Sequence, residues 1–194
     1  MWFHLLLSAL ISVQAYSQSP LTRIAFGSCN SQSGPQDHWP VIEREYPQLW
    51  IWLGDNIYSD GLAPAQKAAA YDSLLKGPYG EFASQIPVIG TWDDHDYDEN
   101  DSDGFYPFKD QSQSVFLDFF NVPVDSPRRM QKGVYWSYKY GPPGKTVKII
   151  LLDLRYFRTP DHLLGNAQWS WLTREMKKKD ADLIILGSSH QVIT

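Results

Sequence analysis

Residues 86–101 of the chain read Ile-Pro-Val-Ile-Gly-Thr-Trp-Asp-Asp-His-Asp-Tyr-Asp-Glu-Asn-Asp. The apolar part, residues 86–92, predicts a short buried strand that begins near Pro87. The acidic part holds six carboxylates, which remain ionised side by side only when they are solvated, hydrogen-bonded or close to cations. Open α/β sheets bind ligands outside the carboxyl ends of their strands, so this position favours a metal or catalytic site over a solvated acidic loop.

Length and composition are typical of one globular domain. The chain has 194 residues, a net charge of -5 and 43% hydrophobic residues, which is enough apolar material for a substantial core. It is not basic enough to bind nucleic acid through charge, and it is not polar enough to be disordered. We expect one domain over residues 20–194, without a segment that inserts stably into a membrane.

Residues 1–19 have the pattern of a cleaved secretory signal peptide. They contain no Asp, Glu, Lys or Arg, and the apolar run from Phe3 to Val13 is too short to span a bilayer. Small residues follow at the positions that a signal peptidase recognises, Val13 and Ala15. We therefore expect a secreted protein, located outside the cell, in the lumen of the secretory pathway or in the periplasm. The alternative is a buried first helix.

The single cysteine, Cys29, excludes a disulfide within the chain. A lone thiol in an exported protein is a chemical liability unless it is buried and inert or bound to a metal. The sequence pattern alone leaves both interpretations open.

Apolar runs alternate with helical patterns along the chain. We expect strands over residues 22–27, 49–53, 86–92, 133–140, 146–152 and 183–186, the fourth and fifth forming a hairpin. We expect helices over residues 39–46, 64–75, 115–120 and 166–179. In the last helix, Trp169, Leu172 and Met176 recur at a spacing that predicts an inward-facing side. This alternation predicts a layered α/β fold with antiparallel additions.

Polar side chains follow four of the expected strands. They are Cys29, Asp55 with Tyr58, Asp93-Asp94-His95, and Asp153 with Arg155. Each alone is weak evidence, because an Asp after a strand is commonly a turn residue or a helix cap. Together they suit two or more cations, which can orient an ester phosphate and supply a hydroxide. Arg155 has two interpretations, a forked donor to phosphate oxygens or the partner of a neighbouring acid such as Asp153.

Five successive motifs resemble those of the PhoD-like alkaline phosphatases, which belong to the calcineurin-like metallophosphatase superfamily. They are Gly27-Ser28-Cys29, GDNIY at 54–58, TWDDHDY at 91–97, Asp153-Leu154-Arg155 and LGNAQWSWL at 164–172. The resemblance implies a layered αββα sandwich with mixed sheets. It also implies a phosphoric ester hydrolase, of alkaline phosphatase or phosphodiesterase type, that acts on a small phosphate mono- or diester. Its implied metals are Fe3+ and Ca2+ rather than Zn2+ or Mn2+.

The resemblance implies metal ligands residue by residue. Cys29 would be a thiolate ligand, Asp55 a bridging carboxylate and Tyr58 a phenolate ligand. Asp94 stands where the superfamily has a metal-binding Asn, and Asp93 is a second candidate ligand. Thiolate and phenolate suit trivalent iron, whereas hard carboxylates suit calcium.

Other residues take roles in the reaction under the same resemblance. His95 would be the catalytic acid for the leaving group, while Asn56 and Arg155 would bind the substrate, Arg155 also as a catalytic residue. The superfamily completes its metal site with a later Gly-Asp-x-His type motif, and His190 lies at the place of an earlier one. We therefore expect a chain truncated at its C-terminal side, the N-terminal part of a catalytic domain that lacks at least one Asp and one His ligand.

The expected consequence is weak or absent turnover, and the alternative function is a non-catalytic, exported metal-binding or pseudo-enzyme domain. Other classes fit less well. An EF-hand is disfavoured, because in a loop that starts at Asp94 the turn glycine is replaced by Glu99 and the bidentate Glu by Phe105, and other starts fail in the same way. A serine hydrolase needs a Gly-x-Ser-x-Gly elbow, which residues 187–191 lack.

Overall fold

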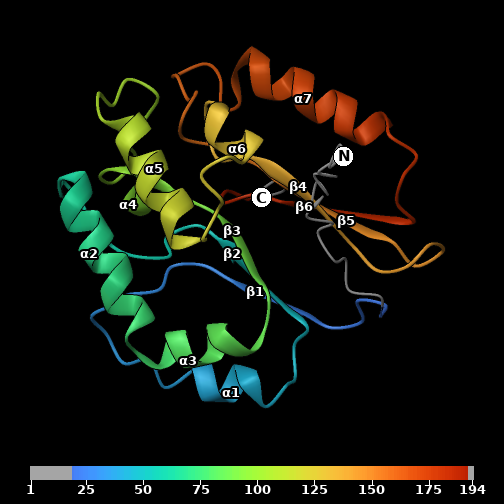
Figure 1. The fold of residues 1–194 in the computed structure, drawn as a ribbon. Coiled ribbons are helices and arrows are strands. Elements are labelled where there is room, and N and C mark those ends of the chain that lie inside the picture. Colours follow the sequence, from blue (N-terminus) through green and yellow to red (C-terminus); the bar gives the residue numbers. More distant parts are fainter. Residues whose placement is uncertain (1–18, 192–194) are drawn as a thin grey trace, which may run out of the picture.

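The structure is a computed structural model that describes residues 19–191. Apart from Ser19, the predicted signal peptide lies outside these residues. Within the described part of the chain, no helix is both long and apolar enough to cross a membrane. The strands lie in the middle of the molecule, and the helices lie on both sides of them (Figure 1).

The first sheet consists of three parallel strands in the order β1-β2-β3. These strands are β1 (Ile24–Gly27), β2 (Leu49–Leu53) and β3 (Val88–Thr91). The helices that connect or follow them are α1 (Trp39–Glu43), α2 (Pro64–Leu75), α3 (Pro78–Gln85), α4 (Asp94–Tyr97) and α5 (Lys109–Phe119). Helices α2 and α3 each begin with a proline, whose missing N–H has no partner in a first turn anyway. The predicted bounds of β2 and α2 are confirmed.

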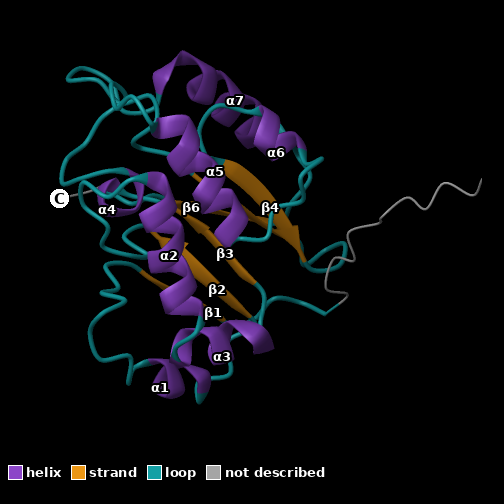
Figure 2. Cartoon of the chain, turned by 60° about the vertical axis from the view of Figure 1, so that its left-hand side comes forward, coloured by secondary structure: helices purple, strands orange, loops and turns teal. Residues whose placement is uncertain are grey.

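An aromatic core joins this sheet to its helices. Successive side chains point to opposite faces of a strand, so Trp50 and Trp52 of β2 lie on the same face. Their ring centroids lie 5.1 and 5.4 Å from that of Trp39 in α1. Phe116 and Phe119 of α5 belong to the same buried cluster. Figure 2 shows α1, α2 and α3 on one side of the strands.

The second sheet has the order β4-β5-β6. It consists of β4 (Trp136–Tyr140), β5 (Val147–Leu151) and β6 (Leu183–Gly187). Strand β4 is antiparallel to β5, which confirms the predicted hairpin, and β6 is parallel to β5. Helix α6 (Pro127–Met130) precedes β4, and α7 (Gly165–Lys177) connects β5 to β6.

The two sheets pack face to face. Leu49, Ile51 and Ile89 of the first sheet form one buried cluster with Ile149 and Leu151 of the second. Burying one such side chain completely stabilises a fold by roughly 1.5–3 kcal/mol. Helices cover the outer face of each sheet, so the layers follow the order helix, sheet, sheet, helix. The expected αββα sandwich is confirmed, with a parallel first sheet and a mixed second sheet.

The predicted inward face of α7 is wrong. Trp169 and Met176 are 54% and 49% exposed, and of the three predicted residues only Leu172 is buried. The buried side of the helix carries Gln168 and Glu175 instead. Gln168 accepts the Asp153 N–H at 2.9 Å and donates to the Asp153 carbonyl at 2.7 Å. Specific polar partners inside the protein therefore override the apolar spacing that the sequence presents.

Candidate metal centre

The parallel strands of the first sheet bring three segments to one edge. Gly27 is aligned with Trp52, and Leu53 with Thr91, so the loops after β1, β2 and β3 begin side by side. The Cys29 N–H donates to the Gly54 carbonyl at 3.2 Å, which continues the contact between the first two segments beyond the strands. This alignment confirms that the carboxyl ends of these strands meet.

Cys29 and Asp55 both have a left-handed backbone. Their φ angles are 59° and 50°, a region that residues other than glycine adopt rarely and mostly where the surroundings over-determine them. The Asp55 carbonyl also accepts the Asn30 N–H at 2.8 Å. The two loops therefore support each other's strained conformation, and they bring Cys29 Sγ to 3.6 Å from Asp55 Oδ2.

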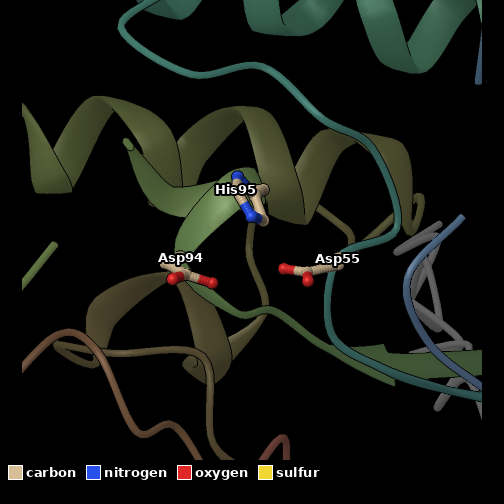
Figure 3. Close-up of side chains that lie close together, drawn as sticks. All are labelled: Asp55, Asp94 and His95. Carbon is tan, nitrogen blue, oxygen red and sulfur yellow. The ribbon is translucent and has the colours of Figure 1, made fainter. Parts of the chain in front are cut away.

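Asp55, Asp94 and His95 form a compact group of potential metal ligands. One ligand atom from each residue lies within 4.8 Å of the other two. Figure 3 shows both carboxylates and the imidazole converging, Asp55 from the loop after β2 and the other two from α4. Oxygen and imidazole nitrogen donors at such separations are able to share one cation.

The electrostatics of Asp55 fit a bound cation. Burial, together with the negative charges of Asp93 and Asp94, raises the pKa of Asp55 to about 6. Its Oδ1 atom is buried and has no hydrogen-bond partner among residues 19–191. A buried carboxylate that is not paired is costly, and a metal ion would supply the missing positive charge. The residues present therefore fit a metal site.

Cys29 and Tyr58 lie at the border of this group. Cys29 is exposed, and the Tyr58 ring lies 4.3 Å from the His95 ring between centroids. Burial, followed by the negative charge of Asp55, raises the pKa of Tyr58. The structure thus brings a thiol, a phenol and a carboxylate together, and Tyr58 needs a nearby cation to ionise near neutral pH.

Arg155 forms an ion pair with Asp93. The Arg155 side chain is 2% exposed, and its Nε lies 2.5 Å from Asp93 Oδ1. Its Nη2 lies 3.5 Å from Asp94 Oδ2, so the guanidinium places a positive charge beside the proposed ligand. Burial raises the pKa of Asp94, but the Asp101 N–H and the charge of Arg155 outweigh it and lower the pKa overall.

Asp153 is not the partner of the Arg155 side chain. Its carboxylate accepts backbone N–H groups of Val134, Arg155 and Tyr156 instead, at 2.8 to 2.9 Å. It is fully buried, and these bonds hold the loop after β5. Of the two interpretations of Arg155, an ion pair with a neighbouring acid is the one that the structure contains.

Asn56 lies inside the protein. It is fully buried, and its Nδ2 donates to the Thr91 carbonyl at 3.2 Å. Its Oδ1 is buried and accepts no hydrogen bond from the part of the chain that the structure describes. Asn56 therefore adjoins Asp55 along the chain without an exposed group that could contact a substrate.

Several residues around the group are not evident from the sequence motifs. His95 Nδ1 forms a hydrogen bond with Asp60, while the other ring nitrogen faces the carboxylates (Figure 3). Ser59 Oγ donates to the His95 carbonyl at 2.7 Å. Burial lowers the pKa of His95, but the hydrogen bond to Asp60 and the charge of Asp55 raise it overall. The sequence indicated a role for Asp60 only through its position, five residues after Asp55.

His190 contacts the ion pair of Arg155 and Asp93 from the second sheet. Its Nε2 lies 2.7 Å from Arg155 Nη2, and its neighbour Ser189 donates to Asp93 Oδ1 at 2.9 Å. Both residues follow β6, so this strand end joins those of the first sheet. The sequence already placed His190 shortly after an expected strand, which is the same signal that identified Asp55.

Comparison with known proteins supports the fold. No protein-family model and no curated protein matches the chain. Among solved structures, the chain resembles PhoD with a TM-score of 0.68 and 19% identity, over 88% of this chain and 42% of PhoD. A dimetal phosphatase from Danio rerio has a TM-score of 0.42 and 18% identity, over 80% of this chain and 52% of that protein.

The likeness to PhoD shows a shared fold, and the resemblance found in the sequence is thereby confirmed at the level of architecture. The chain spans less than half the length of PhoD. The second likeness is too weak to carry an argument about the fold.

Proposed function

We propose that the protein is a metal-dependent phosphoric ester hydrolase of alkaline phosphatase or phosphodiesterase type. The observation that carries this proposal is the convergence of Asp55, Asp94 and His95 at the strand ends of a fold that resembles PhoD. The proposed substrate is a small phosphate mono- or diester, and the proposed location is outside the cytoplasm.

The proposed ligands are Cys29, Asp55, Tyr58 and Asp94, with Asp93 as a second candidate. Thiolate and phenolate donors suit Fe3+, and carboxylates suit Ca2+, so these are the proposed metals. Bound cations supply positive charge to phosphoryl oxygens and favour the ionised form of a water.

His95 is the proposed general acid. Its Nδ1 is held by Asp60, and in this proposal Nε2 does not bind the metal but carries a proton toward a leaving-group oxygen. Contact with the Tyr58 ring restricts the imidazole further. The chain therefore supplies an oriented proton donor beside the proposed metal ligands.

The proposed role of Arg155 in substrate binding is through its charge. The guanidinium is buried against Asp93 and Asp94, and its net effect is to offset part of the negative charge that opposes a phosphate ester. Asn56 has a proposed indirect role, because its buried side chain holds the loop next to Asp55 against Thr91.

One observation favours the alternative, a non-catalytic exported metal-binding domain. The Arg155 guanidinium, a candidate for binding phosphate, is already paired with Asp93 and lies next to His190. A domain that binds metal without hydrolysing a phosphate ester needs no free guanidinium.

Hydrolysis assays with matched variants distinguish the two functions. The full chain is purified without chelators, its metals are measured by mass spectrometry, and p-nitrophenyl phosphate and bis(p-nitrophenyl) phosphate are assayed with Fe3+ and Ca2+, or with Zn2+ or Mn2+. Asp94→Ala tests the site, and the exposed Glu99→Ala is a control from the same acidic run. We expect metal-dependent hydrolysis that only Asp94→Ala abolishes. Bound metal without hydrolysis supports the alternative, and a chain that binds no metal refutes both.

A further inference from the structure

Asp96 has an unusual set of hydrogen-bond donors for a carboxylate in a short helix. It is 2% exposed. Its Oδ1 accepts the Asn56 N–H at 3.0 Å, the Ile57 N–H at 3.3 Å and the Tyr71 hydroxyl at 2.8 Å. Its Oδ2 accepts the Asp93 N–H at 3.0 Å and lies 3.2 Å from the Asn56 nitrogen. These donors come from three separate segments of the chain.

The two oxygens of this carboxylate link the two loops of the candidate metal centre. The Oδ1 contacts reach the residues directly after Asp55, and the principal Oδ2 contact reaches the residue directly before Asp94. Two other bonds cross between these loops, from Asn56 Nδ2 to Thr91 and from Ser59 to His95. Of the residues that the structure describes, only Asp96 binds an immediate neighbour of both Asp55 and Asp94.

Helix capping explains only part of this arrangement. Asp96 and Asp93 form a reciprocal capping box at the start of α4, and a capping box needs only the Asp93 N–H as donor to Asp96. It does not require the donors from residues 56 and 57 or from Tyr71. A buried carboxylate needs hydrogen-bond donors, and those beyond the capping box come from the loop after β2 and from Tyr71 of α2. This loop and α2 therefore jointly determine the position of the Asp96 carboxylate.

We propose that Asp96 is a positioning residue that sets the distance between Asp55 and Asp94 and thereby the metal affinity of the site. This inference rests on the metal site of the proposed function, but not on catalysis. Partners outside the ligand shell orient ligands, and their loss commonly lowers metal affinity.

A pair of variants separates positioning from general stability. Asp96→Asn keeps the size of the side chain, but its NH2 group cannot accept a hydrogen bond. When the amide oxygen of the variant side chain accepts from Asn56, Ile57 and Tyr71, its NH2 group faces the Asp93 N–H and cannot accept from it. The link between the two loops is therefore broken. Tyr71→Phe removes one hydrogen bond to the same carboxylate and leaves both loop contacts intact. Each variant therefore loses about one buried hydrogen bond.

The readout is the affinity for Mn2+, measured on the full chain from the electron paramagnetic resonance signal of the free ion, with Ca2+ affinity from calorimetry as a second value. Unfolding midpoints are measured in parallel, in the absence of metal. We expect Asp96→Asn to bind Mn2+ at least about tenfold more weakly than the natural chain, and Tyr71→Phe to bind it like the natural chain. Both variants should have lower unfolding midpoints.

Equal metal affinities in all three proteins overturn the inference, as does an equal loss in both variants. A natural chain that binds neither ion also overturns it. If Asp96→Asn does not fold, Asp96→Glu replaces it, because the longer side chain keeps both oxygens and displaces them, and the same loss of affinity is expected. Metal binding with the expected pattern but without phosphatase activity refutes the proposed function and leaves this inference standing.

Discussion

Replacing Asp55 by Asn should stabilise the metal-free protein while it removes a proposed ligand. Asp55 Oδ1 is buried and has no hydrogen-bond partner among the described residues. Burial, with the charges of Asp93 and Asp94, raises the pKa of Asp55 to about 6. Asn has nearly the same shape without the charge. It is also among the residues that best tolerate a positive φ, which is 50° at this position.

The magnitude follows from the two pKa values. A carboxyl whose pKa is 3.8 when unfolded and about 6 when folded destabilises the folded state once it ionises. The penalty is complete above pH 6, decreases as the pH falls from 6 to 4, and disappears below pH 4. The full difference corresponds to about 3 kcal/mol. Because the negative charges of Asp93 and Asp94 supply part of the shift in the pKa of Asp55, we expect roughly 1–3 kcal/mol at pH 8.

Urea unfolding followed by circular dichroism, in the presence of a chelator, measures this effect. Asp55→Asn should be more stable than the natural chain at pH 8 and equal to it near pH 3.5. The exposed Asp161→Asn controls for the change in net charge. Metal at a hundred times its dissociation constant should stabilise the natural chain by about 2.7 kcal/mol and the variant by much less. A variant that is less stable at pH 8 without metal would refute the reasoning.

Further predictions concern the ion pair of Arg155, helix α7 and the thiol of Cys29. Arg155→Met should destabilise the metal-free protein by about 3–5 kcal/mol, because it leaves buried carboxylates unpaired, and added metal should restore part of this loss in urea unfolding. Leu172→Ala should cost about 2–5 kcal/mol, whereas Trp169→Ala should change the free energy of unfolding by no more than ~0.5 kcal/mol, with thermal unfolding as the measurement. Iodoacetamide should alkylate the exposed Cys29 more slowly in the metal-loaded protein, as mass spectrometry would detect, because a bound thiolate is not free to react. Equal alkylation rates with and without metal would exclude Cys29 as a ligand.

Local patterns were sufficient for most of the secondary structure. The apolar run of β2 and the proline-led, alanine-rich pattern of α2 predicted both elements with their observed bounds, because each is bounded by residues that end a strand or a helix. The face of α7 was not predictable in this way. Its buried Gln168 and Glu175 are bound by Asp153 and by Lys148 of β5, and neither partner is close to them in sequence.

In the candidate site, too, local patterns predicted some residues, whereas their partners depended on tertiary packing. Positions directly after strands predicted Cys29, Asp55 and Asp94, and the parallel register brings their loops together. The partner of Arg155 was left open, because the sequence offers a phosphate, Asp153 or another neighbouring acid. Only packing decides that Asp93 Oδ1 lies 2.5 Å from its Nε. The role of Asp60 beside His95 was missed for the same reason.

By itself, the sequence determined that strands end in acids, a thiol and an imidazole, because hydrophobic periodicity and turn chemistry are local properties of a chain. Tertiary structure decided which of those groups meet. In the acidic run of residues 93–101, Asp94 faces Asp55 across the site, Asp93 neutralises Arg155, and Asp96 turns inward to bind both loops. Neighbouring carboxylates of identical chemistry thus acquire different tasks, because their surroundings in the folded protein, and not their place in the sequence, set their partners and their charge.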